Sequence, residues 1–526
     1  MGKRVDNDYI RPMLYLIRYD ELALKSEYVR KKWEDRLINS IKRRIKSCNI
    51  RHERGRIWVY SEEDVSSKLR TIPGIHSFSL CYPCTLEDLK ENLLKFVGRS
   101  LNNEKTFALR VKRTGDHDFT SQDVAREMGA IIQEEYPFLS VDLEDPEKEI
   151  FIEIRDRDCY IFDNIIKGVG GLPEGVEGSV LGCLSSELDL LACWMMIQRG
   201  CNISAISTDK DLSRSDDLLQ VLREFKPDIE SSIVRDKDDL FLISKTKKAL
   251  GIVTGDIRIP SYLQDFSKET QKDDNKYKIP IYQPLIGLKK KHIDKFEKIL
   301  KINPNINREY DLLDERPFSK IVSLMSDGID SPVATYLLLD KDVDVITVHF
   351  DNSPFIGREN LQKYKKIIDH LDKSFNKDIK AYVIPNGINL RSFAEDCKES
   401  LRCILCKRMM LKIADYIADK ELADGIVTGE SIGQVASQTL HNLCILDQTV
   451  EKQIIRPLIG MNKIEIIDIA KLIGTYDTSI SPNLECKIVP KRPATSARLD
   501  DVMHEEAKID MKSLIKESIN NAYLLN

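Results

Sequence analysis

Apolar and polar positions follow two different periods in the first part of the chain. Residues 13–19 (MLYLIRY) and 56–61 (RIWVYS) have the pattern of partly buried strands, whereas residues 22–45 between them follow the helical period. This order of strand, helix and strand predicts a small α+β unit.

A second set of alternating segments follows, and it ends in a glycine-rich stretch. The pattern predicts a strand at 106–114, an amphipathic helix at 121–136, and a hairpin formed by 149–156 and 158–163. The segment GVGGLPEGVEG at 168–178 contains five glycines and a proline, so it predicts a domain boundary.

From residue 179 onward, strand segments alternate with helical ones, which predicts parallel sheets covered by helices. Three segments of this region recur later in the same order, at offsets of 141, 174 and 173 residues. The pairs are 179–196 with 320–338, 250–257 with 424–432, and 281–299 with 454–472. We interpret the region as a duplicated α/β domain. The polar stretch at 267–278 is expected to be a surface loop of the first copy.

Composition is that of an ordinary globular protein, with 526 residues of which 42% are hydrophobic and 31% charged. No apolar run approaches the roughly 20 residues of a transmembrane helix, and the N-terminal segment lacks the apolar core of a signal peptide. We therefore expect a cytoplasmic protein with no membrane partner. In that compartment the 12 cysteines are not expected to form a disulfide framework.

The net charge of -5 is unevenly distributed along the chain. Between Lys25 and Arg56, twelve lysines and arginines stand against four acidic residues. Such a run is typical of a solvated helix face, but it also suits a surface that binds a phosphate backbone. Composition alone leaves both interpretations open.

The segment SLMSDGIDSPVA at 323–334 joins a predicted strand to a predicted helix. Its small residues Ser326, Gly328 and Ser331 would let backbone N–H groups approach an anion near the positive end of that helix. Asp330 offers an oxygen ligand for Mg²⁺. The segment is not a Walker-type loop, because it lacks GxxxxGK[ST]. An ordinary turn before a helix is the alternative for this segment in isolation.

The first copy has a damaged version of this loop, GCLSSELDLLACW. Glu187 stands where the second copy has Gly328, and Leu190 stands where it has Ser331. A carboxylate and a branched apolar side chain at these positions would oppose the approach of phosphate. We therefore predict that the first copy does not bind a phosphate ligand and serves as structural support or as one half of an internal pseudo-dimer.

Two cysteine pairs have the CxxC spacing. Cys403 and Cys406 are three residues apart on a predicted helix, so their thiols share one face. In a cytosolic protein this spacing is typical of a redox or metal motif, and Cys486 is a candidate third member. For Cys81 and Cys84 we expect a structural role, because no third partner is evident nearby.

Several motifs resemble those of one enzyme family. SDGIDSPVA resembles the SGGxDSPVA pyrophosphate loop of ATP-pyrophosphatase (PP-loop) enzymes, with Asp327 where the family has glycine. TGESIGQVASQT, RPLIGMNKIEIIDIAKLIGTYD and LECKIVPKRPATSA resemble the other motifs of the tRNA 4-thiouridine synthetases. Upstream, IRYDELALKS resembles the ferredoxin-like domain of that family, and ALRVKRTGDHDFTSQDVAREMGA its THUMP RNA-binding domain.

The resemblance implies a multidomain fold of the α/β and α+β classes. It divides the chain into an N-terminal ferredoxin-like domain at 1–80, a THUMP domain at 81–167, a degenerate PP-loop domain at 175–305, a catalytic PP-loop ATP-pyrophosphatase domain at 315–500, and a C-terminal helical tail at 501–526.

The resemblance also implies an activity. Enzymes of this family use ATP and Mg²⁺ to adenylate O4 of the uridine at tRNA position 8, and sulfur then displaces AMP to give 4-thiouridine. Carried over by motif, the residues that contact ATP are Leu324, Met325, Ser326, Gly328, Asp330, Ser331, His349, Phe350, Lys407, Gly429 and Gln438. The candidates for phosphate contacts with tRNA are Lys25, Arg30, Lys31, Lys32, Arg110, Lys112 and Arg113.

Sulfur delivery is implied to depend on cysteines, and Cys403 and Cys406 are the catalytic candidates together with Asp330. In the archaeal-like branch without a rhodanese domain, which this chain resembles, Cys403, Cys406 and Cys486 would hold an iron–sulfur cluster that presents sulfide. The alternative is a persulfide on Cys403 or Cys406, with the pair ending as a disulfide. The sulfur donor would be free sulfide or a cysteine desulfurase.

Two other functions compete with tRNA thiolation. Asp327 favours a non-catalytic tRNA-binding protein whose PP-loop domains have both decayed. The intact Gly328, Asp330, Ser331 and Gln438 favour the enzyme instead. Sulfur transfer toward the thiazole of thiamine is known for relatives and is a further alternative. A homodimer and an internal pseudo-dimer are both compatible with the sequence. In the terms of this family, we predict that the degenerate first copy does not bind ATP, and a platform for tRNA is a further role open to it.

Overall fold

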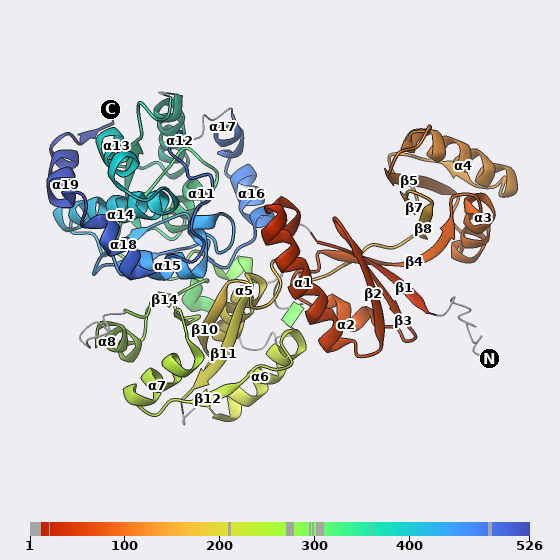
Figure 1. Ribbon diagram of the computed structural model, residues 1–526, viewed down its shortest axis with the longest axis horizontal. Helices are drawn as coiled ribbons and strands as arrows, with labels where there is room; N and C mark the ends of the chain where they lie inside the picture. The colour runs from red at the N-terminus through yellow and green to blue at the C-terminus, as the bar shows by residue number, and fades with distance from the viewer. Residues whose placement is uncertain are drawn as a thin grey trace. The chain divides into compact units, whose positions relative to one another are not determined.

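The computed structural model describes residues 12–525, except 20, 209–211, 270–277, 294, 295, 297, 298, 301–309, 358 and 482–485. It divides into two compact units, Met1–Pro173 and Glu174–Asn526. In Figure 1 the first unit runs from red to orange and the second from yellow to blue. The division falls inside the glycine-rich segment at 168–178.

One twisted sheet runs through the whole first unit, in the order β2-β3-β1-β4-β8-β7-β5-β6, with β9 also pairing with β4. Its strands are β1 (Met13–Arg18), β2 (Cys48–Glu53), β3 (Arg56–Ser61), β4 (Ser77–Thr85), β5 (Thr106–Thr114), β6 (Ser140–Val141), β7 (Lys148–Arg155), β8 (Asp158–Phe162) and β9 (Ile166–Lys167). The helices are α1 (Glu27–Arg44), α2 (Ser66–Arg70), α3 (Leu89–Ser100) and α4 (Ser121–Glu135). The helix expected at 22–45 therefore begins at Glu27, because Glu21–Leu24 form a separate 3₁₀ turn.

Strand β4 connects the two parts of this unit. Residues 77–81 of β4 pair with β1, and residues 82–85 pair with β8. The domain boundary expected between residues 80 and 81 thus lies inside a continuous strand. Leu14 and Leu16 from β1 share a core with Trp58, Tyr160 and Phe162.

The outer part of the first unit has its own core between helices and sheet. Val124, Met128 and Ile132 recur at helical spacing along α4 and pack against the inward residues of β5 and β7. A capping box between Thr120 and Asp123 starts the helix by satisfying backbone N–H groups that have no partner in the first turn.

The second unit contains two sheets with a common strand order. The first half (residues 175–300) has the parallel order β12-β11-β10-β13-β14, and the second half (residues 310–525) has the order β19-β18-β15-β16-β17-β20. Strands of the first half are β10 (Gly178–Cys183), β11 (Cys201–Ser207), β12 (Ser231–Ile233), β13 (Ile252–Val253) and β14 (Ile281–Tyr282). Those of the second half are β15 (Lys320–Leu324), β16 (Asp344–Asp351), β17 (Ala381–Pro385), β18 (Gly425–Val427), β19 (Gln453–Ile455) and β20 (Tyr523–Leu524). The first strand of each half lies in the middle of its sheet, and this shared order supports the duplication, which stays a hypothesis.

Helices cover both sheets of the second unit, as Figure 1 shows. In the first half they are α5 (Glu187–Gln198), α6 (Leu212–Phe225), α7 (Lys237–Lys247) and α8 (Ser261–Glu269). In the second half they are α11 (Asp330–Leu339), α12 (Glu359–Phe375), α13 (Gly387–Asp396), α14 (Arg402–Lys420), α15 (Leu440–Asp447), α16 (Lys463–Leu472), α17 (Tyr476–Ile480), α18 (Leu499–Glu506) and α19 (Met511–Asn520). Every residue of α5 is buried, as expected for a helix that is apolar on all sides.

The two halves pack through the recurring PLIG segments, 284–287 and 457–460. A Cβ atom on Gly287 would lie 3.0 Å from Pro457 and 3.1 Å from Leu337. A Cβ atom on Gly460 would lie 3.0 Å from Met195 and 3.1 Å from Pro284. Each glycine therefore lets the other half approach closely, and the arrangement is nearly symmetric.

The C-terminal segment belongs to the second sheet. Besides the expected helices α18 and α19, it supplies β20, in which Tyr523 and Leu524 pair antiparallel with β17. Buried Glu506 accepts a hydrogen bond from Arg408 Nε at 2.6 Å, which ties α18 to α14. Residues 270–277 of the expected polar loop lie outside the described residues. Among the described residues, none of the helices combines the length and the apolar composition needed to span a bilayer.

Candidate functional site

Two adjoining cavities open at the carboxyl ends of β15, β16 and β18 in the second half. The smaller has an empty volume of about 560 Å³ and the larger about 770 Å³, and Leu324, Ser326 and Met410 line both. Of the residues expected to contact ATP, the smaller cavity also has Met325, His349 and Phe350, and the larger has Gly328, Asp330, Ser331, Lys407, Gly429 and Gln438. All eleven residues named from the motifs thus come together, at the place where parallel sheets commonly bind ligands.

The loop after β15 is held in shape by its own serines. The backbone N–H of Ser326 donates to Ser331 Oγ at 2.9 Å, and that of Gly328 donates to Ser326 Oγ at 3.3 Å. Gly429 lies directly against the start of α11, because a Cβ atom there would be 2.6 Å from the backbone of Ser331. The first turn of α11 therefore lines the larger cavity, and its positive end favours an anion.

Charged side chains at the larger cavity are paired across elements. Lys463, the first residue of α16, lies with Nζ 2.5 Å from Asp330 Oδ1. Lys407 Nζ on α14 lies 2.8 Å from Glu430 Oε1. Our sequence analysis missed Lys463 and Glu430 as site residues, although both lie within the quoted motifs RPLIGMNK and TGESIG. The sequence of these motifs does not indicate that Lys463 pairs with Asp330 or that Glu430 pairs with Lys407.

Asp327 faces the smaller cavity and does not line the larger one. Its side chain is buried, and Oδ2 has no hydrogen-bond partner in the described part of the chain. Asp327 thus lines a different cavity from the one lined by Gly328, Asp330 and Ser331.

His349 is both a cavity residue and a packed core residue. Its Nδ1 lies 3.1 Å from the carbonyl oxygen of Met325, and its ring stacks on Tyr364 with centroids 4.4 Å apart. Burial lowers the pKa of His349, so a neutral imidazole is favoured. The ring is thus held rigidly at the cavity wall.

The three candidate cysteines of the second half are close enough to interact. Cys486 interacts electrostatically with both Cys403 and Cys406, and Asn386 Nδ2 donates to Cys406 Sγ at 3.8 Å. Burial raises the pKa of Cys403, and it raises that of Cys406 to about 12. Within the described residues, which exclude 482–485 next to Cys486, no group of three or more His, Cys, Asp or Glu is arranged to hold a metal ion.

In the first half, the corresponding loop is closed by its own side chains. Asp189 accepts hydrogen bonds from the backbone N–H of Gly255 at 2.7 Å and of Ser185 at 3.0 Å. Glu187 forms an ion pair with Arg214. The carboxylate of Asp189 therefore occupies donors that an anion would need, which supports the prediction that this half does not bind ATP.

The basic residues in and just before α1 differ in how far their side chains are exposed to solvent. Arg30 is buried, with Nε 3.6 Å from Glu34 Oε1, and this burial speaks against Arg30 as a phosphate contact. Lys31 and Lys32 are exposed, as the phosphate-binding interpretation requires. Lys25 Nζ lies 5.3 Å from the centroid of the Trp33 ring.

A cavity on the sheet of the first unit contains two further candidates, Arg110 and Lys112. It has an empty volume of about 590 Å³, and Arg18, Phe151 and Phe162 also line it. The two phenylalanine rings are stacked at 5.2 Å, and Arg18 lies over Phe162 at 4.8 Å. Our sequence analysis missed Arg18, whose only signal was a cation inside an apolar strand.

The structure also gives the contacts of Arg113 and Cys84 in the outer part of the first unit. Arg113 donates to the carbonyl oxygen of Gly115 at 3.2 Å. Cys84 lies directly opposite Cys159 in the antiparallel ladder of β4 and β8, and the two thiols interact. The expectation that Cys81 and Cys84 have no further cysteine nearby was therefore wrong.

Parts of the chain match known domain families, and nearly the whole chain is similar to named proteins. Residues 318–511 match the family described as "Thiamine biosynthesis protein (ThiI)", residues 84–163 match the THUMP domain, and residues 14–79 match the ThiI ferredoxin-like domain. A protein of Methanothermobacter thermautotrophicus named "Probable tRNA sulfurtransferase" is 29% identical over 512 residues, covering 95% of each chain. A protein of the same name from Methanobrevibacter smithii is 28% identical over 520 residues, covering 97% of each chain. A crystal structure titled as a 4-thiouridine synthetase–RNA complex with bound ATP is 22% identical, covers 98% of this chain and 100% of that one, and has a TM-score of 0.37.

Proposed function

We propose that this chain, which carries the ThiI, THUMP and ThiI ferredoxin-like domains, is an ATP-dependent tRNA sulfurtransferase that makes 4-thiouridine. The observation that carries the proposal is the convergence of all eleven motif residues on two adjoining cavities. The full-length relatives with the sulfurtransferase name support the same reaction.

The two cavities suit the two ends of ATP. The smaller one is lined mainly by apolar side chains such as Met325, Val348 and Phe350, which suit an adenine ring. The larger one has the first turn of α11, the hydroxyl of Ser331 and the ammonium of Lys407, which suit the phosphates. In this pose Asp327 lies near the nucleoside, and its charge stays away from the phosphates.

Adenylation of uridine O4 creates negative charge on the α-phosphate, and Lys407 is placed to stabilise it. Asp330 offers the hard oxygen ligand that Mg²⁺ prefers, and it lines the larger cavity. Lys463 already bonds to Oδ1 of Asp330, so a cation would take Oδ2. Bound there, Mg²⁺ would neutralise charge on the leaving diphosphate.

For sulfur delivery, the ligand chemistry of Cys403, Cys406 and Cys486 suits an iron–sulfur cluster, because thiolates are its usual ligands. Their mutual interactions support this set, although the described residues contain no preformed metal site. A cluster held by three cysteines would supply one iron open to sulfide. The alternative, a persulfide on Cys403 or Cys406, needs no third cysteine.

For tRNA binding we propose the exposed lysines of α1 together with Arg110 and Lys112 of the first unit. The cavity beside Arg110 combines cations with stacked aromatic rings, a combination that suits single-stranded RNA. Phosphate contacts of this kind make binding strongly dependent on salt.

The test is formation of 4-thiouridine by the full chain. After anaerobic cluster reconstitution, the protein is incubated with ATP, Mg²⁺, sulfide and unmodified tRNA, and the 4-thiouridine absorbance is followed. Activity should be lost in Asp330→Ala and kept in the matched control Asp378→Ala, an exposed aspartate of the same half. If the wild-type chain binds tRNA but makes no 4-thiouridine, the non-catalytic tRNA-binding function that Asp327 favours takes its place.

A further inference from the structure

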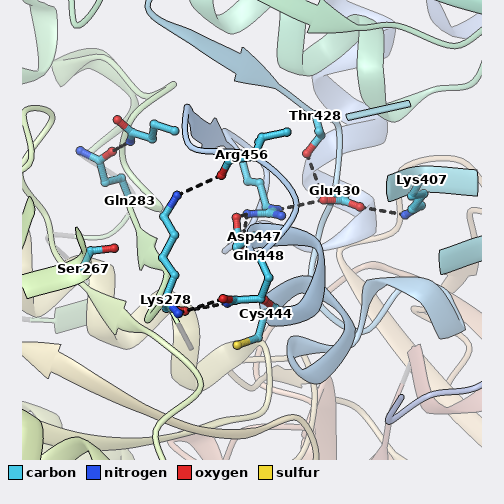
Figure 2. Close-up of polar contacts among 12 residues, drawn as sticks. Ser267, Lys278, Gln283, Lys407, Thr428, Glu430, Cys444, Asp447, Gln448 and Arg456 are labelled. Carbon is cyan, nitrogen blue, oxygen red and sulfur yellow. Dashed lines mark hydrogen bonds and ion pairs between the residues drawn. The ribbon is translucent and has the colours of Figure 1, made fainter. Parts of the chain in front are cut away.

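A row of four alternating charges leads from the larger cavity to the boundary between the two halves of the second unit. Figure 2 shows Lys407, Glu430, Arg456 and Asp447 in this order, joined by polar contacts. Glu430 receives Lys407 Nζ on Oε1 and Arg456 Nε on Oε2, each at 2.8 Å. Arg456 also donates through Nη1 to both oxygens of Asp447, at 2.9 and 3.0 Å.

Burial differs along this row in a way that suggests separate roles. The side chain of Lys407 is 28% exposed, whereas those of Glu430 and Arg456 are 8% and 3% exposed. Lys407 is thus the one member of the row with the exposure needed to meet a ligand. Glu430 also lines the larger cavity, whereas Arg456 does not, and both are buried charges that must be paired and hydrogen-bonded.

Three hydrogen bonds fix the position of the Glu430 carboxylate. Besides Lys407 and Arg456, it accepts a hydrogen bond from Thr428 Oγ1 at 3.1 Å. Burial would raise the pKa of Glu430, but Lys407 and Arg456 outweigh burial and lower the pKa to about 2. The carboxylate is therefore ionised, and it directs the ammonium of Lys407 from a fixed point.

The first half of the unit forms hydrogen bonds with the chain segment that joins Asp447 to Arg456. Asp447 ends α15 and Arg456 follows β19, so the segment 448–455 separates them. The side chain of Gln448 donates to the carbonyl oxygen of Lys278 at 2.7 Å and accepts from its backbone N–H at 2.8 Å. Gln453 Nε2 donates to Gln283 Oε1 at 2.6 Å.

Residues of both halves also lie together next to these hydrogen bonds. Tyr282 and Gln283 from the first half line one small cavity with Gln453 and Arg456 from the second half. Tyr282 is buried and interacts electrostatically with Asp447 and Arg456. A half whose own phosphate loop is closed by Asp189 thus packs directly behind the ion pairs of the other half.

We propose that Arg456 is a positioning residue that sets the place of Lys407 through Glu430, and that residues 278–283 of the first half hold Arg456 and Asp447 in register for this purpose. The inference rests on the proposed function, because it assigns a role to Lys407 in ATP binding and adenylation. It gives the first half a task that needs no nucleotide of its own.

The first experiment compares Arg456→Met with Arg456→Lys in the full chain, by 4-thiouridine formation, calorimetric ATP binding and thermal melting. Arg456→Met should lower kcat by about 10- to 100-fold and weaken ATP binding, with the KM for tRNA unchanged, because a displaced Lys407 loses its geometry. Arg456→Lys should recover to within about fivefold of wild type, since one ammonium can still bond Glu430. Equal losses in both variants, or losses that only follow the melting temperature, would overturn the positioning role.

The second experiment tests the contribution of the first half and does not depend on the folding of Arg456→Met. The double variant Gln448→Ala/Gln453→Ala removes the side-chain bonds to residues 278–283, and Gln220→Ala on the exposed side of α6 is the matched control. The double variant should lower kcat by about 3- to 10-fold while the control keeps the wild-type rate. A wild-type kcat in the double variant refutes the part assigned to the first half. Absence of thiolation by the wild-type chain refutes the proposed function instead, and ATP binding then still tests the positioning of Lys407.

Discussion

Replacing Glu430 by glutamine should destabilise the second unit by an amount that depends on pH. The pKa of Glu430 falls from its ordinary value of 4.5 to about 2 in the folded chain, because Lys407 and Arg456 outweigh the effect of burial. A lowered pKa of this size corresponds to about 3 kcal/mol of stability at neutral pH, which the neutral amide of Glu430→Gln cannot provide. Loss of one partner from a buried ion pair costs a similar amount.

The sign of the pH dependence follows from the direction of the shift. The folded pKa lies below the unfolded one, so this stability is fully present above about pH 4.5 and is lost as the pH falls toward 2. Between pH 7 and pH 3.5, the difference in unfolding free energy between wild type and Glu430→Gln should therefore shrink by roughly 1 kcal/mol.

Urea unfolding measured by tryptophan fluorescence provides the assay. The chain has three tryptophans, of which Trp33 and Trp58 lie in the first unit and Trp194 in the second. With Trp33→Phe and Trp58→Phe as the background, buried Trp194 reports on the unit that contains Glu430. At pH 7 the urea midpoint of Glu430→Gln should fall by roughly 1 M.

Glu230→Gln is the matched control, because the pair of Glu230 with Lys247 is exposed and should leave the midpoint almost unchanged. The reasoning would be refuted by a wild-type midpoint in Glu430→Gln at pH 7. It would also be refuted if the difference between the two proteins stayed the same at pH 7 and pH 3.5.

Three further variants test the site and the RNA-binding surface. Asp327→Gly should keep kcat for 4-thiouridine formation within about threefold of wild type, because this carboxylate does not line the larger cavity, and a greater loss would place it at the reacting groups. Lys31→Glu/Lys32→Glu should weaken tRNA binding and reduce the slope of log K against log salt by about two in filter binding, and an unchanged slope would remove α1 from the interface. Cys486→Ser should lower the iron-to-protein ratio after anaerobic reconstitution, and full iron content with full activity would exclude the three-cysteine cluster.

Elements with a clear period were predictable from the sequence. The strand expected at 106–114 is β5, and the helix expected at 121–136 is α4 to within one residue, because its start has a capping box. The residues of the larger cavity were named from a different signal, the resemblance of their motifs to those of a known family. Gly429 and Ser331 meet because the glycine lets one loop touch the first turn of α11.

Contacts between distant segments were not predictable in this way. Nothing in the pattern around Arg456 indicates that its partners are Glu430 and Asp447, because buried ion pairs depend on how whole elements pack. Arg30 shows the same difficulty in reverse: its place in a basic run suggested exposure, but the turn of α1 points it toward Glu34. The pairing of Cys84 with Cys159 likewise depends on strand register.

The continuous strand β4 has a consequence for how the first unit can be dissected. Because one strand hydrogen-bonds to β1 along its first part and to β8 along its last part, neither part retains a complete sheet without the other. A fragment that stops at residue 80, or one that starts there, would expose an unpaired edge and a divided core shared by Leu16, Trp58 and Tyr160. The two parts should therefore melt together as one cooperative piece, and they can be exchanged between relatives only as a pair.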